Sequence, residues 1–249
     1  PSKGDIALDL NVSEQMIRYA NAGASVVSVL TEPKWFKGSL NDMKMAREAV
    51  SSVAASPSSR VAVLRKDFIV DEYQLYEARA YGADTVLLIV AILDDALLTK
   101  LISKSRELGM EPLVEVNSTH ELTRALACNA LVIGVNNRNL HTFHVDLKTT
   151  ENVMDEIKQK DLKNIDNKKP IVIALSGIKS REDVIRYEKN GVRGVLVGEA
   201  LMRSNDPGLM VSTLIGTTIH KTTLVKICGV RSVEDALVAA KHGADLVGM

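Results

Sequence analysis

Short apolar runs alternate with longer amphipathic segments along the whole chain. The runs are rich in β-branched residues, and those at 84–90 and 171–175 are apolar almost throughout, which predicts strands buried on both faces of a parallel sheet. The segments between the runs carry apolar residues at helical spacing, so the pattern indicates repeated βα units. We expect strands near residues 25–31, 60–66, 84–90, 112–116, 131–136, 170–175, 194–198, 223–227 and 245–249.

Polar and glycine residues mark where the predicted helices begin and end. Asp94 precedes a run of leucines at helical spacing and Gly109 follows it, as expected of an N-cap and of a glycine just after a helix. Ser180 and Asp183 have the spacing of a capping box. A recurring Gly-Ala step, as at Gly82, stands where a helix turns into the next strand. These signals support the boundaries given by the apolar pattern.

The number of strands points to a barrel. A (β/α)8 barrel needs eight strands, and seven are predicted up to residue 198. A polar stretch at 216–222 then precedes two further strands, and it is a plausible domain linker. The fold class predicted is α/β: a TIM barrel lacking its first strand over residues 1–215, then the opening βαβ unit of a second barrel over 223–249. The chain opens on Pro1 and stops at Met249 within an apolar run, so we expect a piece of a longer polypeptide.

Composition narrows the class of protein. The 31 basic and 31 acidic residues balance, which argues against a dedicated surface for nucleic acid or for an anionic membrane. Two cysteines in 249 residues cannot make a disulfide framework, and no Cys or His spacing offers a metal site. No apolar run reaches the roughly 18 residues of a membrane span. We therefore expect a cytoplasmic protein without a metal.

Candidate chemistry follows from the barrel, because barrel enzymes carry their functional groups at the carboxyl ends of the strands. Lys66 ends one predicted strand, Glu115 lies near the end of another, and Asn136 ends a third. A lysine and a glutamate across a barrel mouth form an acid/base pair whose protonation burial and mutual charge can tune. The alternatives are ordinary ones: Lys66 could be a surface cation, and Glu115 could cap the next helix.

Two further strand ends carry glycine turns. Ser176-Gly177 follows the strand at 170–175, and Gly198-Glu199 follows the strand at 194–198. Glycine lets backbone N–H groups approach an anion closely, so these turns could hold a phosphate. Ser-Gly is also a common turn dipeptide, which makes it weak evidence when taken alone.

Seven ordered motifs run through the chain up to about residue 215. They are Pro1-Ser-Lys-Gly4, Leu30-Thr-Glu-Pro-Lys-Trp-Phe-Lys-Gly-Ser39, Leu64-Arg-Lys-Asp-Phe-Ile69, Ala83-Asp-Thr-Val-Leu-Leu-Ile89, Glu111-Pro-Leu-Val-Glu-Val116, Ile133-Gly-Val-Asn-Asn-Arg138 and Leu175-Ser-Gly-Ile178. Together they resemble indole-3-glycerol phosphate synthase over residues 1 to about 215.

The end of the chain carries Leu224-Val-Lys-Ile-Cys-Gly-Val-Arg-Ser-Val-Glu-Asp235 and then Gly243-Ala-Asp-Leu-Val-Gly248. Residues 224–249 thereby resemble the start of phosphoribosylanthranilate isomerase. That order of domains is similar to multifunctional tryptophan-biosynthesis proteins of fungi.

The resemblance implies a lyase that converts 1-(2-carboxyphenylamino)-1-deoxyribulose 5-phosphate into indole-3-glycerol phosphate, carbon dioxide and water, without a cofactor. It implies catalytic roles for Lys66 as proton donor at the ribulose carbonyl, for Glu115 as acid/base, and for Asn136 and Ser176 toward the substrate. The other residues that it implies line the apolar wall (Phe36, Phe68, Leu87, Leu113), support Asn136 (Arg138) or bind the phosphate (Gly177, Gly198, and Glu199 through its N–H).

Three points limit this transfer. Many family members have glutamate before the Ser-Gly pair, where this chain has Leu175. The family's first strand, with a catalytic Glu and Lys and a phosphate-binding Ser, would lie before Pro1. Cys228 matches the general base of the isomerase, whose remaining site residues would lie beyond Met249. We expect partners in the form of a fused isomerase domain downstream and possibly a glutamine amidotransferase domain upstream.

Two other functions fit the residues. An aldolase-type barrel would use Lys66 to form a Schiff base with a sugar phosphate. A non-catalytic scaffold domain would only bind phosphate, and Leu175 keeps that hypothesis open.

Overall fold

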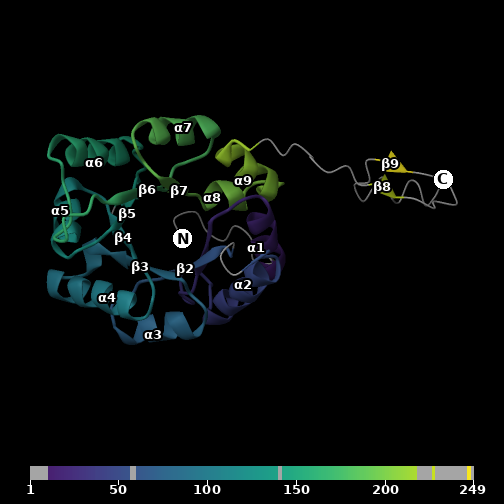
Figure 1. The fold of residues 1–249 in the computed structure, drawn as a ribbon, viewed down its shortest axis with the longest axis horizontal. Coiled ribbons are helices and arrows are strands. Elements are labelled where there is room, and N and C mark those ends of the chain that lie inside the picture. The colour runs from purple at the N-terminus through teal and green to yellow at the C-terminus, as the bar shows by residue number, and fades with distance from the viewer. Residues whose placement is uncertain (1–10, 57–59, 140–141, 218–225, 228–245, 248–249) are drawn as a thin grey trace. The chain divides into compact units, whose positions relative to one another are not determined.

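Seven parallel strands form one sheet in the computed structural model, which describes residues 11–56, 60–139, 142–217, 226–227 and 246–247. Each strand pairs with the next one along the chain, and Figure 1 shows the strands around a central axis with the helices outside them. The strands are β1 (Val26–Leu30), β2 (Ala62–Lys66), β3 (Thr85–Ile89), β4 (Leu113–Val116), β5 (Val132–Asn136), β6 (Ile171–Leu175) and β7 (Gly194–Leu196). The barrel-like α/β architecture is confirmed, and each of these strands begins and ends within two residues of the prediction.

Helices follow the strands and cover the outside of the sheet. They are α1 (Val12–Asn21), α2 (Leu40–Ser52), α3 (Tyr73–Ala80), the 3-10 turn η2 (Val90–Ile92), α4 (Asp95–Glu107), α5 (Thr119–Ala127), α6 (Lys148–Gln159), α7 (Arg181–Lys189), α8 (Glu199–Met202) and α9 (Pro207–Ile215). The predicted caps are confirmed: the Asp94 carboxylate accepts the Leu97 N–H at 2.8 Å, and Ser180 and Asp183 form a reciprocal capping box. Within the described residues, no helix combines the length and apolar character that a membrane crossing needs.

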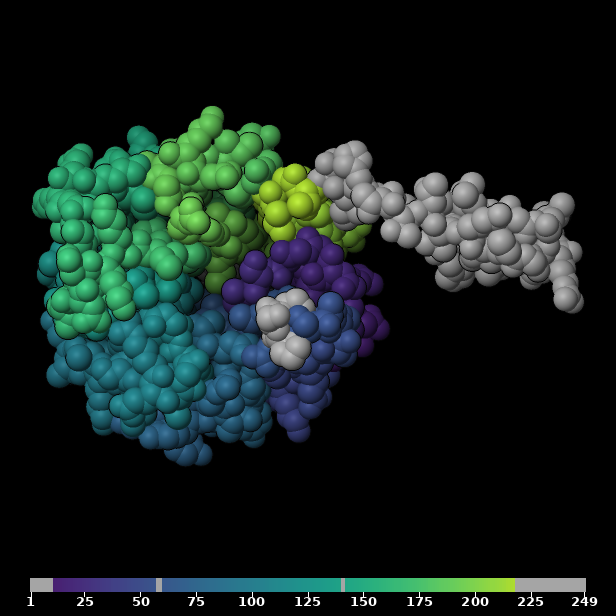
Figure 2. Space-filling view, in the orientation of Figure 1, coloured from purple at the N-terminus to yellow at the C-terminus, as the bar shows by residue number. Residues whose placement is uncertain are grey.

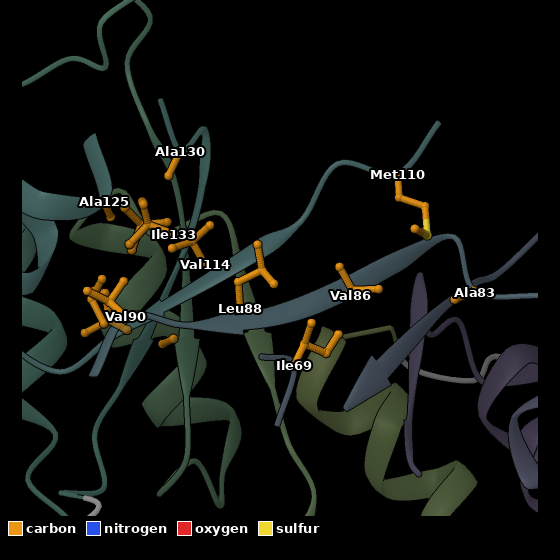
Figure 3. Packing of buried hydrophobic residues seen from close by; sticks show 14 of the residues in the cluster. Ile69, Ala83, Val86, Leu88, Val90, Met110, Val114, Ala125, Ala130 and Ile133 are labelled. Atoms are coloured by element: carbon orange, nitrogen blue, oxygen red, sulfur yellow. The ribbon is translucent and has the colours of Figure 1, made fainter. Parts of the chain in front are cut away.

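Alternation along the strands divides the buried residues into two cores. Side chains such as Val86, Leu88 and Val114 leave the sheet on its outer face and pack under the helices, as Figure 3 shows. Their neighbours in sequence point inward. The inner core consists of Leu64, Leu87, Ile89, Leu113 and Leu175. The face of the sheet to which a residue belongs therefore decides whether it supports a helix or lines the barrel interior.

The described sheet is open between its first and last strands. β1 and β7 each pair on one side only within the described residues. Inner-face side chains beside this opening are exposed, with Val26 of β1 46% and Ile171 of β6 42% accessible, whereas Leu64 of β2 is 1% accessible. The helical layer is continuous across the same place, because α9 packs against α1, seen as yellow-green beside purple in Figure 2. The gap thus lies in the sheet alone.

The chain divides into a compact unit of Pro1–Gly216 and a second unit of Thr217–Met249. The second unit contains two short strands, β8 (Lys226–Ile227) and β9 (Leu246–Val247), which pair in parallel. Both are shorter than the predicted runs at 223–227 and 245–249. A parallel pair requires a crossover connection, and the residues between the two strands lie outside the described ranges.

Candidate active site

Lys66 and Glu115 lie on the same face of the sheet and at the same end of it. Lys66 is the last residue of β2 and stands two residues after Leu64, which belongs to the inner core. Glu115 lies near the end of β4, two residues after Leu113 of that core. Because side chains two residues apart share a face, both functional groups point into the barrel at its carboxyl-terminal rim. The predicted rim positions of this pair therefore agree with the strand geometry.

Glu115 is buried, with 4% of its surface accessible, and a neighbouring strand holds it in place. The Asn136 side-chain amide at the end of β5 donates to Glu115 Oε1 at 2.8 Å. Asn136 Oδ1 in turn accepts the backbone N–H of Arg138 at 2.9 Å, which fixes the orientation of the amide. A buried carboxylate needs such a donor, since an unpaired one would carry a large desolvation penalty. The structure thus brings together two of the predicted catalytic residues.

The interpretation of Glu115 as a helix cap is wrong. Helix α5 is capped by Ser118, whose hydroxyl accepts the Glu121 N–H at 3.2 Å. Serine is a strong N-cap because its short side chain reaches the free N–H groups of the first turn. Glu115, three residues earlier, remains in β4 with its side chain inside the barrel.

The predicted apolar residues form two groups near Lys66. Phe36 and Phe68, from the loops after β1 and β2, lie with their ring centroids 6.0 Å apart. Leu87 and Leu113 pair across β3 and β4 in the inner core, and Leu87 directly follows Val86, which pairs with Arg65 in the register of β2 and β3. An ammonium group beside apolar side chains is poorly solvated, which strengthens its interaction with a developing negative charge.

Leu175 stands where many members of the family that the motifs resemble have glutamate. It pairs in register with Asn136 and is 4% accessible within the inner core. Its Cδ1 lies 2.8 Å from where a Cβ on Gly134 would stand, so the leucine fills the space that this glycine leaves. At this position the chain has a packing residue rather than a carboxylate.

The two glycine turns follow neighbouring strands at the same rim. Ser176 and Gly177 come directly after β6 and both have positive φ, at 65° and 82°. Gly198 precedes α8 after β7, and the Glu199 carboxylate at the start of that helix accepts from Arg138 at 3.2 Å. Arg138 therefore links the end of β5 to the turn after β7. The two glycine turns and Arg138 therefore lie after the carboxyl ends of β5, β6 and β7.

An ion-paired network that the strand pattern did not predict lies behind Lys66. Arg65 points to the outer face, is 3% accessible, and bonds to Asp67 at 2.9 Å and to Glu77 at 2.8 Å. The Thr31 hydroxyl donates to Asp67 at 2.6 Å, and the other Asp67 oxygen accepts the Phe68 N–H at 2.8 Å. The network fixes the turn that carries Phe68. An arginine inside an otherwise apolar run is the signal that could have revealed it.

A second missed residue, Glu32, shapes the loop after β1. Its carboxylate accepts the backbone N–H groups of Lys34, Trp35 and Phe36 at 2.8, 2.6 and 3.0 Å. Desolvation opposes ionisation of this carboxyl, but the three N–H groups outweigh it and hold the pKa of Glu32 below its usual range. The charged form of Glu32 therefore orders the segment that presents Phe36.

Cys228, the residue assigned to the isomerase portion, lies outside the described residues.

The chain is similar to known proteins over nearly all of its length. A family model described as indole-3-glycerol phosphate synthase matches residues 1–214. The chain belongs to the indole-3-glycerol phosphate synthase family. It is 48% identical over 206 residues to the indole-3-glycerol phosphate synthase of Dehalococcoides mccartyi strain CBDB1, covering 83% of this chain and 74% of that protein. The resemblance inferred from the seven motifs is thereby confirmed.

The chain also matches longer proteins. It is 50% identical over 257 residues to a multifunctional tryptophan biosynthesis protein of Phanerodontia chrysosporium, which covers all of this chain and 31% of that protein. The chain thus spans about a third of the length of such relatives. Among solved structures, thiamine phosphate pyrophosphorylase from Pyrococcus furiosus has a TM-score of 0.62 at 17% identity, covering 86% of this chain and 91% of that one. At that identity the likeness concerns the fold alone.

Proposed function

We propose that the whole protein closes the indole ring, converting 1-(2-carboxyphenylamino)-1-deoxyribulose 5-phosphate into indole-3-glycerol phosphate, carbon dioxide and water. Membership of the synthase family supports this reaction. The observation that carries the assignment to residues is the common inner face of Lys66 and Glu115, with Asn136 bonded to Glu115 at 2.8 Å. Acid and base groups on one rim are what a ring closure followed by dehydration requires.

The chemistry begins at the ribulose carbonyl. The aromatic carbon that bears the carboxylate attacks that carbon, and the electron pair of the C=O bond moves to oxygen. The Lys66 ammonium donates a proton to this oxygen as negative charge develops there. Loss of carbon dioxide then returns the electrons of the C–C bond to the ring and restores its aromaticity. A cation beside apolar walls suits the first step, because the low dielectric favours charge neutralisation.

Dehydration completes the indole. The hydroxyl formed in the first step leaves as water after it is protonated, and a proton is removed from the neighbouring carbon to form the double bond. Glu115 is the acid/base group proposed for these transfers, and Asn136 both orients its carboxylate and faces the substrate. Phe36 and Phe68 would contact the anthranilate ring, with Leu87 and Leu113 below it.

The phosphate end of the substrate is assigned to the two glycine turns. Gly177 and Gly198 would offer backbone N–H groups, and so would Glu199, while Ser176 would contact the substrate through its hydroxyl. Arg138 would support Asn136 and, through its ion pair at 3.2 Å, the Glu199 turn. Glycine suits these positions because the absence of a side chain lets an anion reach the backbone.

Further segments would complete the protein. We propose that an eighth strand, encoded before Pro1, fills the opening between β1 and β7 and supplies the remaining catalytic groups. Residues 223–249 would open an isomerase barrel in which Cys228 is the general base, after a linker at 216–222. A glutamine amidotransferase domain upstream is the third proposed part, as in multifunctional relatives. A cytoplasmic location stays a prediction from cysteine usage.

Replacement of Lys66 tests the assignment. In the full-length protein, Lys66→Ala should lower kcat at least roughly a hundredfold, because loss of a positioned proton donor usually costs that much. Indole absorbance with the carboxyphenylamino-ribulose phosphate is the assay. Lys44→Ala, an exposed lysine on α2, is the matched control and should retain parental activity. Ordinary turnover by Lys66→Ala would refute the role, and borohydride trapping of substrate on Lys66 would favour a Schiff-base aldolase instead.

A further inference from the structure

Asn137 is among the most buried polar residues described, although its neighbours Asn136 and Arg138 have the proposed substrate roles. It is 1% accessible. It follows β5, and its backbone N–H donates to the Leu175 carbonyl at 2.9 Å, while its own carbonyl accepts the Asp146 N–H at 2.8 Å. A buried amide of this kind is retained only where its polar atoms are satisfied.

Every polar atom of the Asn137 side chain has a partner. Its Nδ2 donates to the Ser176 carbonyl and to the Tyr187 hydroxyl, each at 3.0 Å. Its Oδ1 accepts from the Thr150 hydroxyl at 2.8 Å and from the Thr150 N–H at 3.2 Å. The Tyr187 hydroxyl in turn donates to the Leu147 carbonyl at 3.1 Å. An amide has two donors and two acceptor sites, so this one is held in a single orientation.

The hydrogen bond to the Ser176 carbonyl also fixes the direction of the next N–H group, because both belong to one peptide plane. The carbonyl of Ser176 and the N–H of Gly177 belong to one planar trans peptide and point in opposite directions. Asn137 holds that carbonyl toward the outer layer beneath α7, so the Gly177 N–H faces the other way, toward the rim. Within the described part of the chain, no acceptor bonds to this N–H.

Both residues of the turn are conformationally constrained. Ser176 has φ at 65°, a conformation that residues with a side chain adopt at an energetic cost. Gly177 packs tightly as well, since a Cβ there would lie 2.6 Å from Val145 and 2.9 Å from Leu147. A strained turn needs an external tie, and the Asn137 amide supplies one.

We infer that Asn137 is a positioning residue, which grips the Ser176 carbonyl and thereby aims the Gly177 N–H at the phosphate group of the substrate. The inference rests on the proposed function for the identity of the ligand, but the orientation of the peptide plane does not. Asn137 touches no substrate itself. It acts through the turn, and through Thr150 and Tyr187 it fixes that turn to α6 and α7.

Asn137→Asp is the decisive variant, because it keeps the size of the side chain and removes both donors. In the full-length protein it should raise KM and the Kd of inorganic phosphate, measured by titration calorimetry, by about tenfold or more, with kcat within about threefold of the parent. The split between KM and kcat separates positioning of the phosphate from general damage. Unchanged phosphate affinity in the folded variant would overturn the inference.

Asn164→Asp is the matched control. Asn164 is also a buried asparagine, 6% accessible, but it lies in the loop before β6, and its Oδ1 accepts the Lys168 N–H, a bond that aspartate can keep. It should leave both KM and phosphate Kd within about twofold of the parent. An equal effect from both variants would mean that burial of a charge, not the grip on Ser176, is responsible, and the inference would fail.

Two further outcomes are distinguishable. If Asn137→Asp does not fold, Tyr187→Phe decides, since it removes one bond of the same amide and should raise phosphate Kd by roughly two- to fivefold; no rise would overturn the inference. If the parent shows no synthase turnover, the proposed function fails, while the phosphate titration still tests the positioning role.

Discussion

At the scale of single residues, the packing of the barrel interior depends on a glycine in β5. Gly134 lies opposite Glu115 in the sheet register, on the inner face of β5. A Cβ at this position would stand 2.8 Å from Leu175 and 3.2 Å from Leu113. Because glycine has no side chain, Leu175 and Leu113 can pack against its backbone beside the buried carboxylate.

Gly134→Ala should consequently destabilise the protein by about 1–3 kcal/mol through overpacking. Urea unfolding followed by circular dichroism measures the change. Gly208→Ala in α9 serves as control, because a Cβ there meets its nearest atom at an ordinary 3.5 Å, and this variant should be at least as stable as the parent. Equal stability of the parent and Gly134→Ala would contradict the packing argument.

At the scale of elements, the sequence was sufficient for strands and their ends but not for the contacts between loops. Lys66 and Glu115 could be placed on a common rim because parallel strands end at the same edge. The support of the Ser176 turn could not be foreseen, since Asn137 bonds to Thr150 13 residues away and to Tyr187 50 residues away. Such partners depend on how the helices pack against the sheet, and the local pattern of apolar and polar residues does not determine that packing. Leu175 was recognised as a departure, but its packing against Gly134 emerged only in three dimensions.

The loop after β1 should be sensitive to acid. The pKa of Glu32 is lowered in the folded protein, so its ordering effect is complete above the usual value of 4.5 and is lost as pH falls through the lower folded value. Fluorescence of Trp35, the sole tryptophan, should change with a midpoint below 4.5. The transition should be missing in Glu32→Gln, whose side chain does not titrate. Far-UV circular dichroism checks that the fold persists; a midpoint above 4.5 would sink this prediction.

At the scale of the whole molecule, the helical and strand layers of the first unit are not equally complete. α1 and α9 meet, and the Tyr19 hydroxyl of α1 lies 3.9 Å from the Met202 sulfur at the end of α8. Beneath them, β1 and β7 present strand edges, and Val26 and Ile171 expose apolar surface to the interior. Open edges of this kind invite pairing with another strand. The proposed eighth strand would satisfy both edges at once.

A polypeptide limited to residues 1–249 should therefore self-associate. Its sedimentation coefficient should rise with concentration, and extension upstream to include the proposed strand should abolish the rise. Val26→Lys places a charge on the exposed inner face of β1 and should weaken the association without the extension. A concentration-independent monomer would argue that the described edges are not available for pairing.

The two adjacent cations of β2 point to opposite faces of the sheet. Arg65 is locked between Asp67 and Glu77 on the helix side, while Lys66 faces the barrel axis. Only the alternation of side chains along the strand separates them. A slip of β2 by one position would exchange the two: a guanidinium, which does not release a proton, would face the barrel interior, and a flexible ammonium would replace the fork that binds two carboxylates. The pairing of β2 with β1 and β3 thus selects which of the two cations faces the interior.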